Sequence, residues 1–195
     1  MKKIKIILII IIACLGATII YNKFDVKETD TTEIDKHLAE YTLLNDDNIY
    51  VFKNIDEIIN IMNNKTGIIL FCNPSSNWCQ YYLKAIDDIA KSNNIKEIYY
   101  NDIKEDRNNN SLKYQKIVSK LYDYLDTDDT NNKRLNMPYL LFIKNGNVVA
   151  YDNRFSMVSS EITAEEYWND PDNVMDFENQ INEYIYLLNK EDIAQ

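Results

Sequence analysis

The sequence is poor in the residues that build most cofactor and metal sites. Its 195 residues include only three glycines, three prolines, three cysteines and one histidine. It has no glycine-rich phosphate loop, no dinucleotide-binding fingerprint and no set of Cys and His at zinc spacing. We therefore expect neither a cofactor nor a bound metal. The single histidine, His37, has no second metal ligand nearby, and we expect it to be solvated.

Positive charge is also scarce. The chain has 21 Lys and Arg against 31 Asp and Glu, a formal net charge of −10. Without a basic stripe it cannot neutralise a phosphate backbone, which argues against a nucleic-acid partner. Residues 1–25 hold four Lys and one Asp, a net charge of +3, which leaves −13 for the remainder. The pattern is that of an acidic domain behind a basic amino terminus.

The amino-terminal segment predicts attachment to a membrane. Three lysines among the first five residues precede an apolar run from 6 to 21. As a helix this run would extend about 24 Å at roughly 1.5 Å per residue, slightly less than a hydrocarbon core of about 30 Å. Snorkelling of Lys5 and an interfacial Tyr21 make a thin span feasible. We interpret residues 1–21 as a transmembrane anchor.

Two alternatives remain for this segment. The sequence Ile-Ile-Ala-Cys at 11–14 resembles a bacterial lipobox, which would make residues 1–21 a lipoprotein signal and Cys14 the lipidated residue. The other alternative is a cleaved signal peptide and full secretion. All three place the domain outside the cytoplasm. Residues 22–47, polar and acidic, are then predicted to be a stalk that carries a domain at 48–190.

The hydrophobic pattern of the domain is typical of an α/β fold. In chain order the expected elements are a strand at 48–53, a helix at 56–62, a strand at 67–71, a helix from 77, a strand at 95–103, a helix at 114–125, strands at 139–144 and 147–151, and a helix at 176–189. The strands at 67–71 and 95–103 should be parallel, whereas Asn145-Gly146 is a two-residue hairpin signal that makes the last two antiparallel. We therefore expect a mixed central sheet with helices on both faces.

Any chemistry is expected at the corner between the strand at 67–71 and the helix from 77. The continuous apolar run Ile68–Phe71 predicts a strand covered on both faces. Asn73 and Pro74 end it, Ser76 stands at a helix N-cap position, and Cys79 falls in the first helical turn. The residues that recur at helical spacing, and should face the core, are Tyr82, Leu83, Ile86, Ile89 and Ala90.

This corner carries a family resemblance. The segment Phe71–Cys79, Phe-Cys-Asn-Pro-Ser-Ser-Asn-Trp-Cys, resembles the active-site segment of the thioredoxin superfamily, in which an apolar strand leads to a C-x-x-C motif that opens a helix. Met137-Pro138 and the hairpin after it are similar to the cis-proline hairpin of that fold. The resemblance covers roughly residues 48–190 and is to membrane-anchored bacterial proteins similar to the bacteriocin transport accessory group. It implies a thioredoxin-like α/β fold.

The motif departs from the family pattern at two positions. Ser76 stands where the family has its attacking cysteine, and Cys79 matches the resolving cysteine. A serine hydroxyl cannot replace a thiolate in thiol-disulfide exchange. Leu70 occupies the strand position where thioredoxins proper carry a buried acid. The resemblance therefore implies a degenerate site of the form S-x-x-C.

Cys72 leaves three interpretations open. It precedes Cys79 by seven residues, and a disulfide between them requires Cα atoms within roughly 7 Å. Such a pair could be redox active, and a location outside the cytoplasm favours its oxidation. Alternatively, both cysteines are buried and inert, or Cys79 is a single reactive thiol.

The resemblance also implies a binding surface. In the superfamily the segment before the cis-proline pairs with an extended substrate through backbone hydrogen bonds. The candidate substrate-binding residues are Trp78, Met137, Pro138 and Tyr139, with core and turn packing as the alternative. The leading hypothesis is a membrane-tethered binding or accessory module for exported proteins or peptides. The alternative is a thiol-disulfide oxidoreductase that uses Cys79 with Cys72 or with a partner's thiol.

Overall fold

The computed structural model describes residues 36–155 and 162–190. The predicted anchor at 1–21, with Cys14, and the predicted stalk up to residue 35 lie outside the described residues. Residues 36–195 group into one unit. Among the described residues, no helix is both long enough and apolar enough to cross a membrane.

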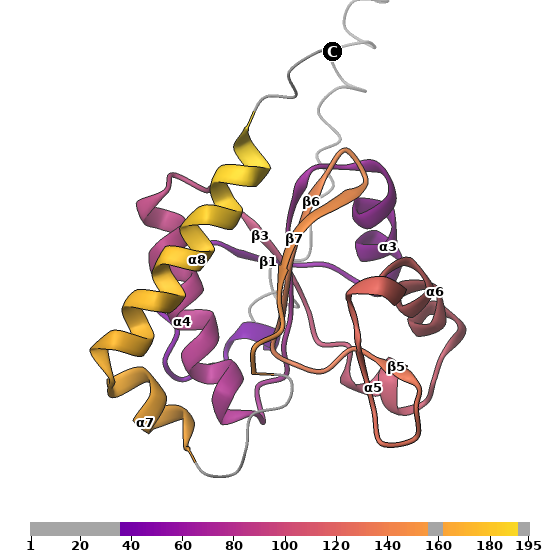
Figure 1. The fold of residues 1–195 in the computed structure, drawn as a ribbon, viewed down its shortest axis with the longest axis horizontal. Helices are drawn as coiled ribbons and strands as arrows, with labels where there is room; N and C mark the ends of the chain where they lie inside the picture. The colour runs from indigo at the N-terminus through magenta and orange to yellow at the C-terminus, as the bar shows by residue number, and fades with distance from the viewer. Residues whose placement is uncertain (1–35, 156–161, 191–195) are drawn as a thin grey trace, which may run out of the picture. The chain divides into compact units, whose positions relative to one another are not determined.

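A five-stranded sheet forms the centre of this unit (Figure 1). Its strands are β1 (Tyr50–Phe52), β2 (Gly67–Phe71), β3 (Ile98–Asn101), β6 (Tyr139–Lys144) and β7 (Asn147–Asp152). They lie in the order β1-β3-β2-β6-β7, with β1, β3 and β2 parallel and with β6 and β7 each antiparallel to its neighbour. The predicted α/β class and mixed sheet are confirmed. The parallel β1-β3-β2 core is compatible with a thioredoxin-like fold.

Helices lie on both sides of the sheet, as predicted (Figure 1). One side carries α4 (Asn77–Ser92), α7 (Ala164–Asn169) and α8 (Pro171–Asn189), and the other α3 (Ile55–Asn64), α5 (Lys104–Asn108) and α6 (Leu112–Lys120). The side chains of β2 alternate between two cores, as the pleat of a strand requires. Leu70 and Cys72 enter the core shared with α4 and α8, whereas Ile69 and Phe71 enter the core shared with α3 and α6.

The hairpin between β6 and β7 forms at the predicted residues. Asn145 and Gly146 have φ angles of 50° and 76°, the left-handed backbone that a tight two-residue hairpin turn needs. The N–H of Gly146 donates to the carbonyl of Lys65 at 2.9 Å, and a Cβ at Gly146 would collide with the carbonyl of Asn63. The turn is thus packed against the end of α3, and only glycine fits there.

Several short elements were not predicted. The helix expected to reach residue 125 ends at Lys120 and continues as a 3-10 turn, η1 (Tyr122–Tyr124). The charged loop after it holds a two-stranded sheet of β4 (Asp126–Thr127) and β5 (Lys133–Arg134). These elements and α5 span at most about one period of the apolar pattern of a helix or strand. The spacing of apolar residues therefore does not predict them. The capping box of Thr163 and Glu166 that starts α7 was a usable signal.

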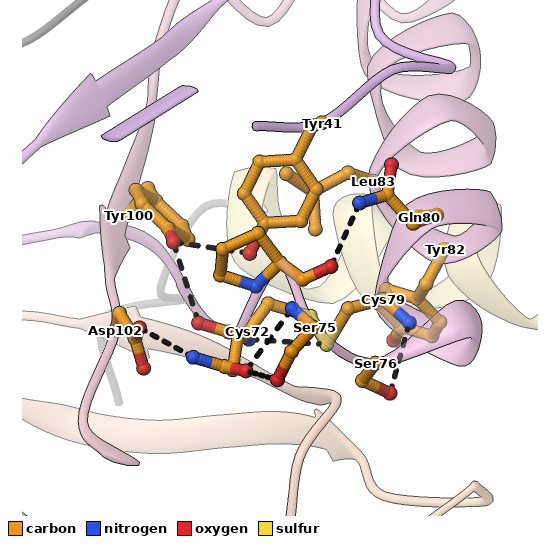
Figure 2. The surroundings of a disulfide bond; sticks show 12 residues. Tyr41, Cys72, Ser75, Ser76, Cys79, Gln80, Tyr82, Leu83, Tyr100 and Asp102 are labelled. Atoms are coloured by element: carbon orange, nitrogen blue, oxygen red, sulfur yellow. Dashed lines mark hydrogen bonds between the residues drawn. A yellow bond between two sulfur atoms is a disulfide. The ribbon is translucent and has the colours of Figure 1, made fainter. Parts of the chain in front are cut away.

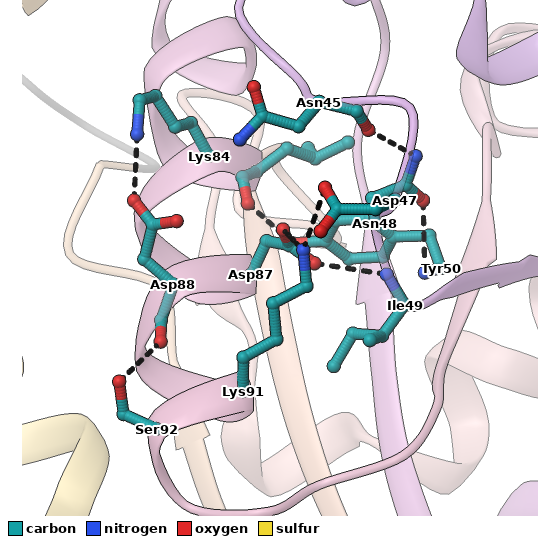
Figure 3. A network of polar contacts seen from close by, with 11 residues as sticks. Asn45, Asp47, Asn48, Ile49, Tyr50, Lys84, Asp87, Asp88, Lys91 and Ser92 are labelled. Atoms are coloured by element: carbon teal, nitrogen blue, oxygen red, sulfur yellow. Dashed lines mark hydrogen bonds and ion pairs between the residues drawn. The ribbon is translucent and has the colours of Figure 1, made fainter.

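Residues 36–49, called the lead-in segment below, pack onto the domain, although the sequence assigned 36–47 to the stalk. The backbone N–H of Ile49 donates to the carboxylate of Asp87 at 3.0 Å, and Asp87 pairs with Lys91 at 2.8 Å (Figure 3). Lys91 also reaches Asp47 at 3.3 Å. The folded unit therefore begins before residue 48. His37 is exposed and stacks on Phe52, with ring centroids 4.3 Å apart.

Candidate functional site

Cys72 and Cys79 are joined by a disulfide (Figure 2). Cys72 directly follows β2, Cys79 lies in the first turn of α4, and their Cα atoms are 5.7 Å apart, a usual separation for a disulfide. Of the three interpretations that the sequence left open, the bonded pair is the one that the structure contains. The interpretation of Cys79 as a single reactive thiol is therefore wrong, whereas the burial expected for both cysteines is confirmed.

The disulfide is closed off from solvent. Both cysteines have 0% relative exposure and belong to the core under α4 and α8. Exchange of a disulfide requires an attacking thiolate to reach one of its sulfur atoms along the S–S axis. No such approach exists in this conformation, so the bond acts here as a cross-link of the strand-to-helix corner.

Ser76 caps the helix that carries Cys79. Its hydroxyl accepts a hydrogen bond from the backbone N–H of Cys79 at 3.5 Å, and its backbone is extended, as N-cap residues are. The N-cap prediction for Ser76 is confirmed. The position aligned with an attacking cysteine thus carries a partly exposed hydroxyl that holds the helix start in place.

The turn between the two cysteines is built around Asn73, which the sequence analysis used only as a strand end. Its side-chain amide donates to Asp102 at 2.6 Å, and its side-chain carbonyl accepts from the backbone N–H of Ser75 at 3.1 Å and from Lys104 at 3.4 Å. Its own backbone N–H points to the sulfur of Cys79 at 3.3 Å. An Asn that follows a strand and precedes a Pro is a turn signal, but nothing in the sequence indicates that its partners come from the residues just after β3.

The lead-in segment packs on the core that contains the disulfide, and its Tyr41 lies near Tyr100 in Figure 2. The hydroxyls of Tyr41 and Tyr100 are hydrogen-bonded at 3.0 Å, and the hydroxyl of Tyr100 donates to the carbonyl of Cys72 at 3.4 Å. Burial raises the pKa of both tyrosines well above the usual value near 10. Neither residue was predicted to lie at the site, because Tyr41 was assigned to the stalk and Tyr100 only to the strand at 95–103.

Gln80 ties the lead-in segment to the turn. Its side-chain amide donates to the carbonyls of Glu40 at 3.0 Å and Pro74 at 2.8 Å, and its side-chain carbonyl accepts from the N–H of Thr42 at 2.9 Å. One side chain next to Cys79 therefore holds both the lead-in segment and the loop that the disulfide closes.

The peptide bond between Met137 and Pro138 is cis, as the resemblance implied. Tyr139, the first residue of β6, pairs with Phe71, the last residue of β2. Pro138 and Cys72 are thus the next residues along these two neighbouring strands, at the same end of the sheet. Pro138 is buried and Met137 is partly exposed.

The four candidate substrate-binding residues do not share one environment. The side chain of Tyr139 enters the core on the opposite side from the disulfide, where its hydroxyl donates to the carbonyl of Tyr124 at 3.0 Å. Trp78 is partly exposed and stacks on Phe155, with ring centroids 4.7 Å apart. Trp78 and Met137 are the two whose side chains reach solvent.

An aromatic group that the sequence analysis did not find surrounds Trp78. It joins α4, α7, α8 and the loop after β7, and consists of Trp78, Tyr82, Phe155, Tyr167, Trp168 and Phe177. Under it, the hydroxyl of Tyr82 donates to the buried carboxylate of Asp152 at 2.7 Å. Burial and this carboxylate raise the pKa of Tyr82.

No protein-family model matches the chain, and no curated protein matches its sequence. Within residues 36–155 and 162–190, no group of three or more His, Cys, Asp and Glu side chains is arranged to hold a metal ion. What the described residues offer is a shielded disulfide, a capped helix start and a partly open surface at Trp78 and Met137.

Proposed function

We propose that this chain is a membrane-tethered, thioredoxin-like binding module outside the cytoplasm, which holds exported proteins or peptides without exchanging disulfides with them. The observation that carries the proposal is the pairing of a fully buried Cys72–Cys79 disulfide with a serine at the helix N-cap. A thioredoxin-type reaction needs an accessible attacking sulfur at that N-cap. In this chain Ser76 occupies that position, where it caps the helix but has no sulfur atom.

Binding would use the backbone and side chains that remain accessible near the cis-proline. Among the described residues, the backbone of Met137 makes no hydrogen bond to another backbone group. A free N–H and C=O beside a sheet end can pair with an extended chain. Trp78 adds a partly exposed aromatic surface on the same side of the sheet as the disulfide, the kind of residue that often anchors a bound chain.

The second candidate function is thiol-disulfide exchange by Cys72 and Cys79, or by Cys79 with a partner's thiol. The disulfide itself favours it, because it lies at the strand-to-helix corner beside Pro138. This function requires part of the surrounding structure to move, since both cysteines are fully buried.

One experiment separates the two candidates. The full chain, in a mild non-ionic detergent, is tested for binding of a fluorescently labelled unfolded protein whose cysteines have been reduced and alkylated. In parallel, its catalysis of insulin reduction by dithiothreitol is measured. The binding module predicts saturable binding of the thiol-free chain and reduction at the uncatalysed rate. Catalysed reduction that disappears in Cys79→Ser would establish the oxidoreductase instead.

Substitution at Trp78 tests the binding surface. Trp78→Ala should weaken binding about tenfold or more, because a partly buried aromatic anchor typically contributes at least 2 kcal/mol to binding. The matched control is Leu112→Ala, which removes an exposed apolar side chain on the far side of the sheet and should leave binding unchanged. Equal effects of both variants would show that the chain binds unfolded proteins through general surface hydrophobicity, against the proposal.

A further inference from the structure

We propose that the hollow between α6 and the β4–β5 hairpin binds a phosphate group. The cavity has a volume of about 570 Å³, and its lining includes Arg107, Lys133 and Arg134. These residues come from α5 and β5, on the side of the sheet away from the disulfide. The site is therefore separate from the proposed peptide-binding surface.

The charge of this hollow is opposite to that of the chain. Three cations and one carboxylate, Asp128, line it, a net charge of +2 in a chain whose net charge is −10. The carboxylate is occupied by its own loop, since it accepts from the N–H and hydroxyl of Thr130 at 2.9 and 2.7 Å and from the N–H of Asn132 at 2.9 Å. Within the part of the chain that the structure describes, none of the three cations forms an ion pair.

Arg107 is the side chain that most needs a counter-ion. It is half-buried, and one of its terminal nitrogens donates to the carbonyl of Leu135 at 3.3 Å. Its Nε is buried and has no hydrogen-bond partner among the described residues. Burial, and after it the positive charge of Arg134, lower the pKa of Arg107. Two guanidinium groups near each other, neither of them in an ion pair with a described carboxylate, are stabilised by a bound anion.

Lys133 is fixed at the edge of the same hollow. Its ammonium group donates to the carbonyl of Leu125 at 2.7 Å and lies 5.5 Å from the centre of the Tyr122 ring. An ammonium group has three donors, so two remain for a ligand. Binding would therefore require little additional ordering of this side chain.

The arrangement suits phosphate better than carboxylate. Guanidinium groups bind phosphate oxygens in a planar, two-pronged geometry, and two of them with an ammonium group match three terminal oxygens. A phosphate monoester also carries a charge of about −1.5 to −2 near neutral pH, which balances the +2 of the hollow. The phosphate can come from free phosphate or from a phosphate monoester.

The test is a calorimetric titration of the full chain in a non-ionic detergent at constant ionic strength. The ligands are inorganic phosphate, glycerol 1-phosphate and malonate. Saturable binding of either phosphate compound, at least tenfold tighter than malonate, is the expected result. Tighter binding of inorganic phosphate identifies the free ion as the ligand, and tighter binding of glycerol 1-phosphate identifies an ester. No binding, or malonate bound as tightly, would overturn the proposal.

Two variants locate the site. Arg134→Gln removes an exposed guanidinium and should reduce phosphate affinity at least tenfold without affecting folding. Lys116→Gln removes one positive charge from an exposed position on α6 that does not line the hollow, and should change the affinity less than twofold. If the two variants lose affinity equally, the interaction is general charge attraction and the assigned site is wrong. Neither outcome depends on the peptide-binding proposal.

Discussion

Ser76 shows how one side chain decides between a reactive site and a structural one. Its hydroxyl caps α4 by accepting a hydrogen bond from the N–H of Cys79, three residues further along the chain. A sulfur atom in place of this hydroxyl would lie close to the sulfur of Cys79. We expect Ser76→Cys to introduce a thiolate that attacks Cys79, forms a new disulfide with it and releases the thiolate of Cys72. The exchanged protein should then reduce insulin in the presence of dithiothreitol.

The measurement for this variant is disulfide mapping by mass spectrometry, together with the insulin assay. Ser75→Cys is the matched control, because it places a thiol in the same exposed turn but not at the helix N-cap. Loss of the serine cap should also cost about 1 kcal/mol of stability. If Ser76→Cys retains the Cys72–Cys79 bond and remains inactive, the corner is not a dormant redox site.

Asp87 is a second residue whose surroundings set its importance. It is 1% exposed and accepts a hydrogen bond from the N–H of Ile49, whereas its neighbour Asp88 is exposed and forms an ion pair with Lys84. We expect Asp87→Ala to lower the free energy of unfolding by about 1–3 kcal/mol, because the Ile49 N–H loses its acceptor. Asp88→Ala should cost about 0–1 kcal/mol, as exposed ion pairs do. Urea denaturation of both variants with unchanged m-values is the measurement, and equal midpoints would contradict the assignment.

At the scale of elements, we expect the lead-in segment to control access to the disulfide, because it packs on the core that contains both cysteines. Gln80 joins it to the turn after β2 through two hydrogen bonds to Glu40 and Thr42 of the segment and one to Pro74 of the turn. Each of these hydrogen bonds contributes about 1 kcal/mol to stability, and less here because Gln80 is partly exposed. We expect Gln80→Ala to increase the rate at which dithiothreitol reduces the Cys72–Cys79 bond about tenfold.

The rate is measured by trapping free thiols during reduction under native conditions. Gln115→Ala is the control, since it removes one side-chain hydrogen bond, to Asn110, from α6 on the other side of the sheet. Its reduction rate should match that of the unmodified chain. If Gln80→Ala is reduced no faster, the disulfide becomes accessible only by global unfolding and the lead-in segment is not its cover.

The elements also show which parts of the fold sequence reasoning can reach. The apolar run of β2, the cap at Ser76 and the Asn145-Gly146 turn are local signals, and each gave a correct element. The lead-in segment was missed because its contacts join residues about 40 to 60 positions apart, such as Tyr41 with Tyr100. The disulfide was an intermediate case. The spacing of its cysteines in the sequence allowed the bond, but it could not establish that their Cα atoms lie close enough to form it.

At the scale of the whole molecule, buried tyrosines link stability to alkaline pH. Burial is the main cause that raises the pKa of five of them: Tyr41, Tyr50, Tyr82, Tyr100 and Tyr139. In the unfolded chain these groups ionise near pH 10, while in the folded chain they keep their protons. Above that pH the unfolded state binds fewer protons than the folded state, so the free energy of unfolding falls as pH rises.

This linkage predicts full stability below about pH 10 and cooperative unfolding above it. Tyrosinate absorbance from the buried tyrosines should appear together with the loss of helical circular dichroism, because they ionise only when the core opens. Tyr122→Phe removes the ionisable hydroxyl of an exposed tyrosine and should leave the pH midpoint of unfolding unchanged. Ionisation of all the tyrosines with the circular dichroism intact would mean that the two cores on either side of the sheet admit water and hydroxide, contrary to the packing that shields the disulfide.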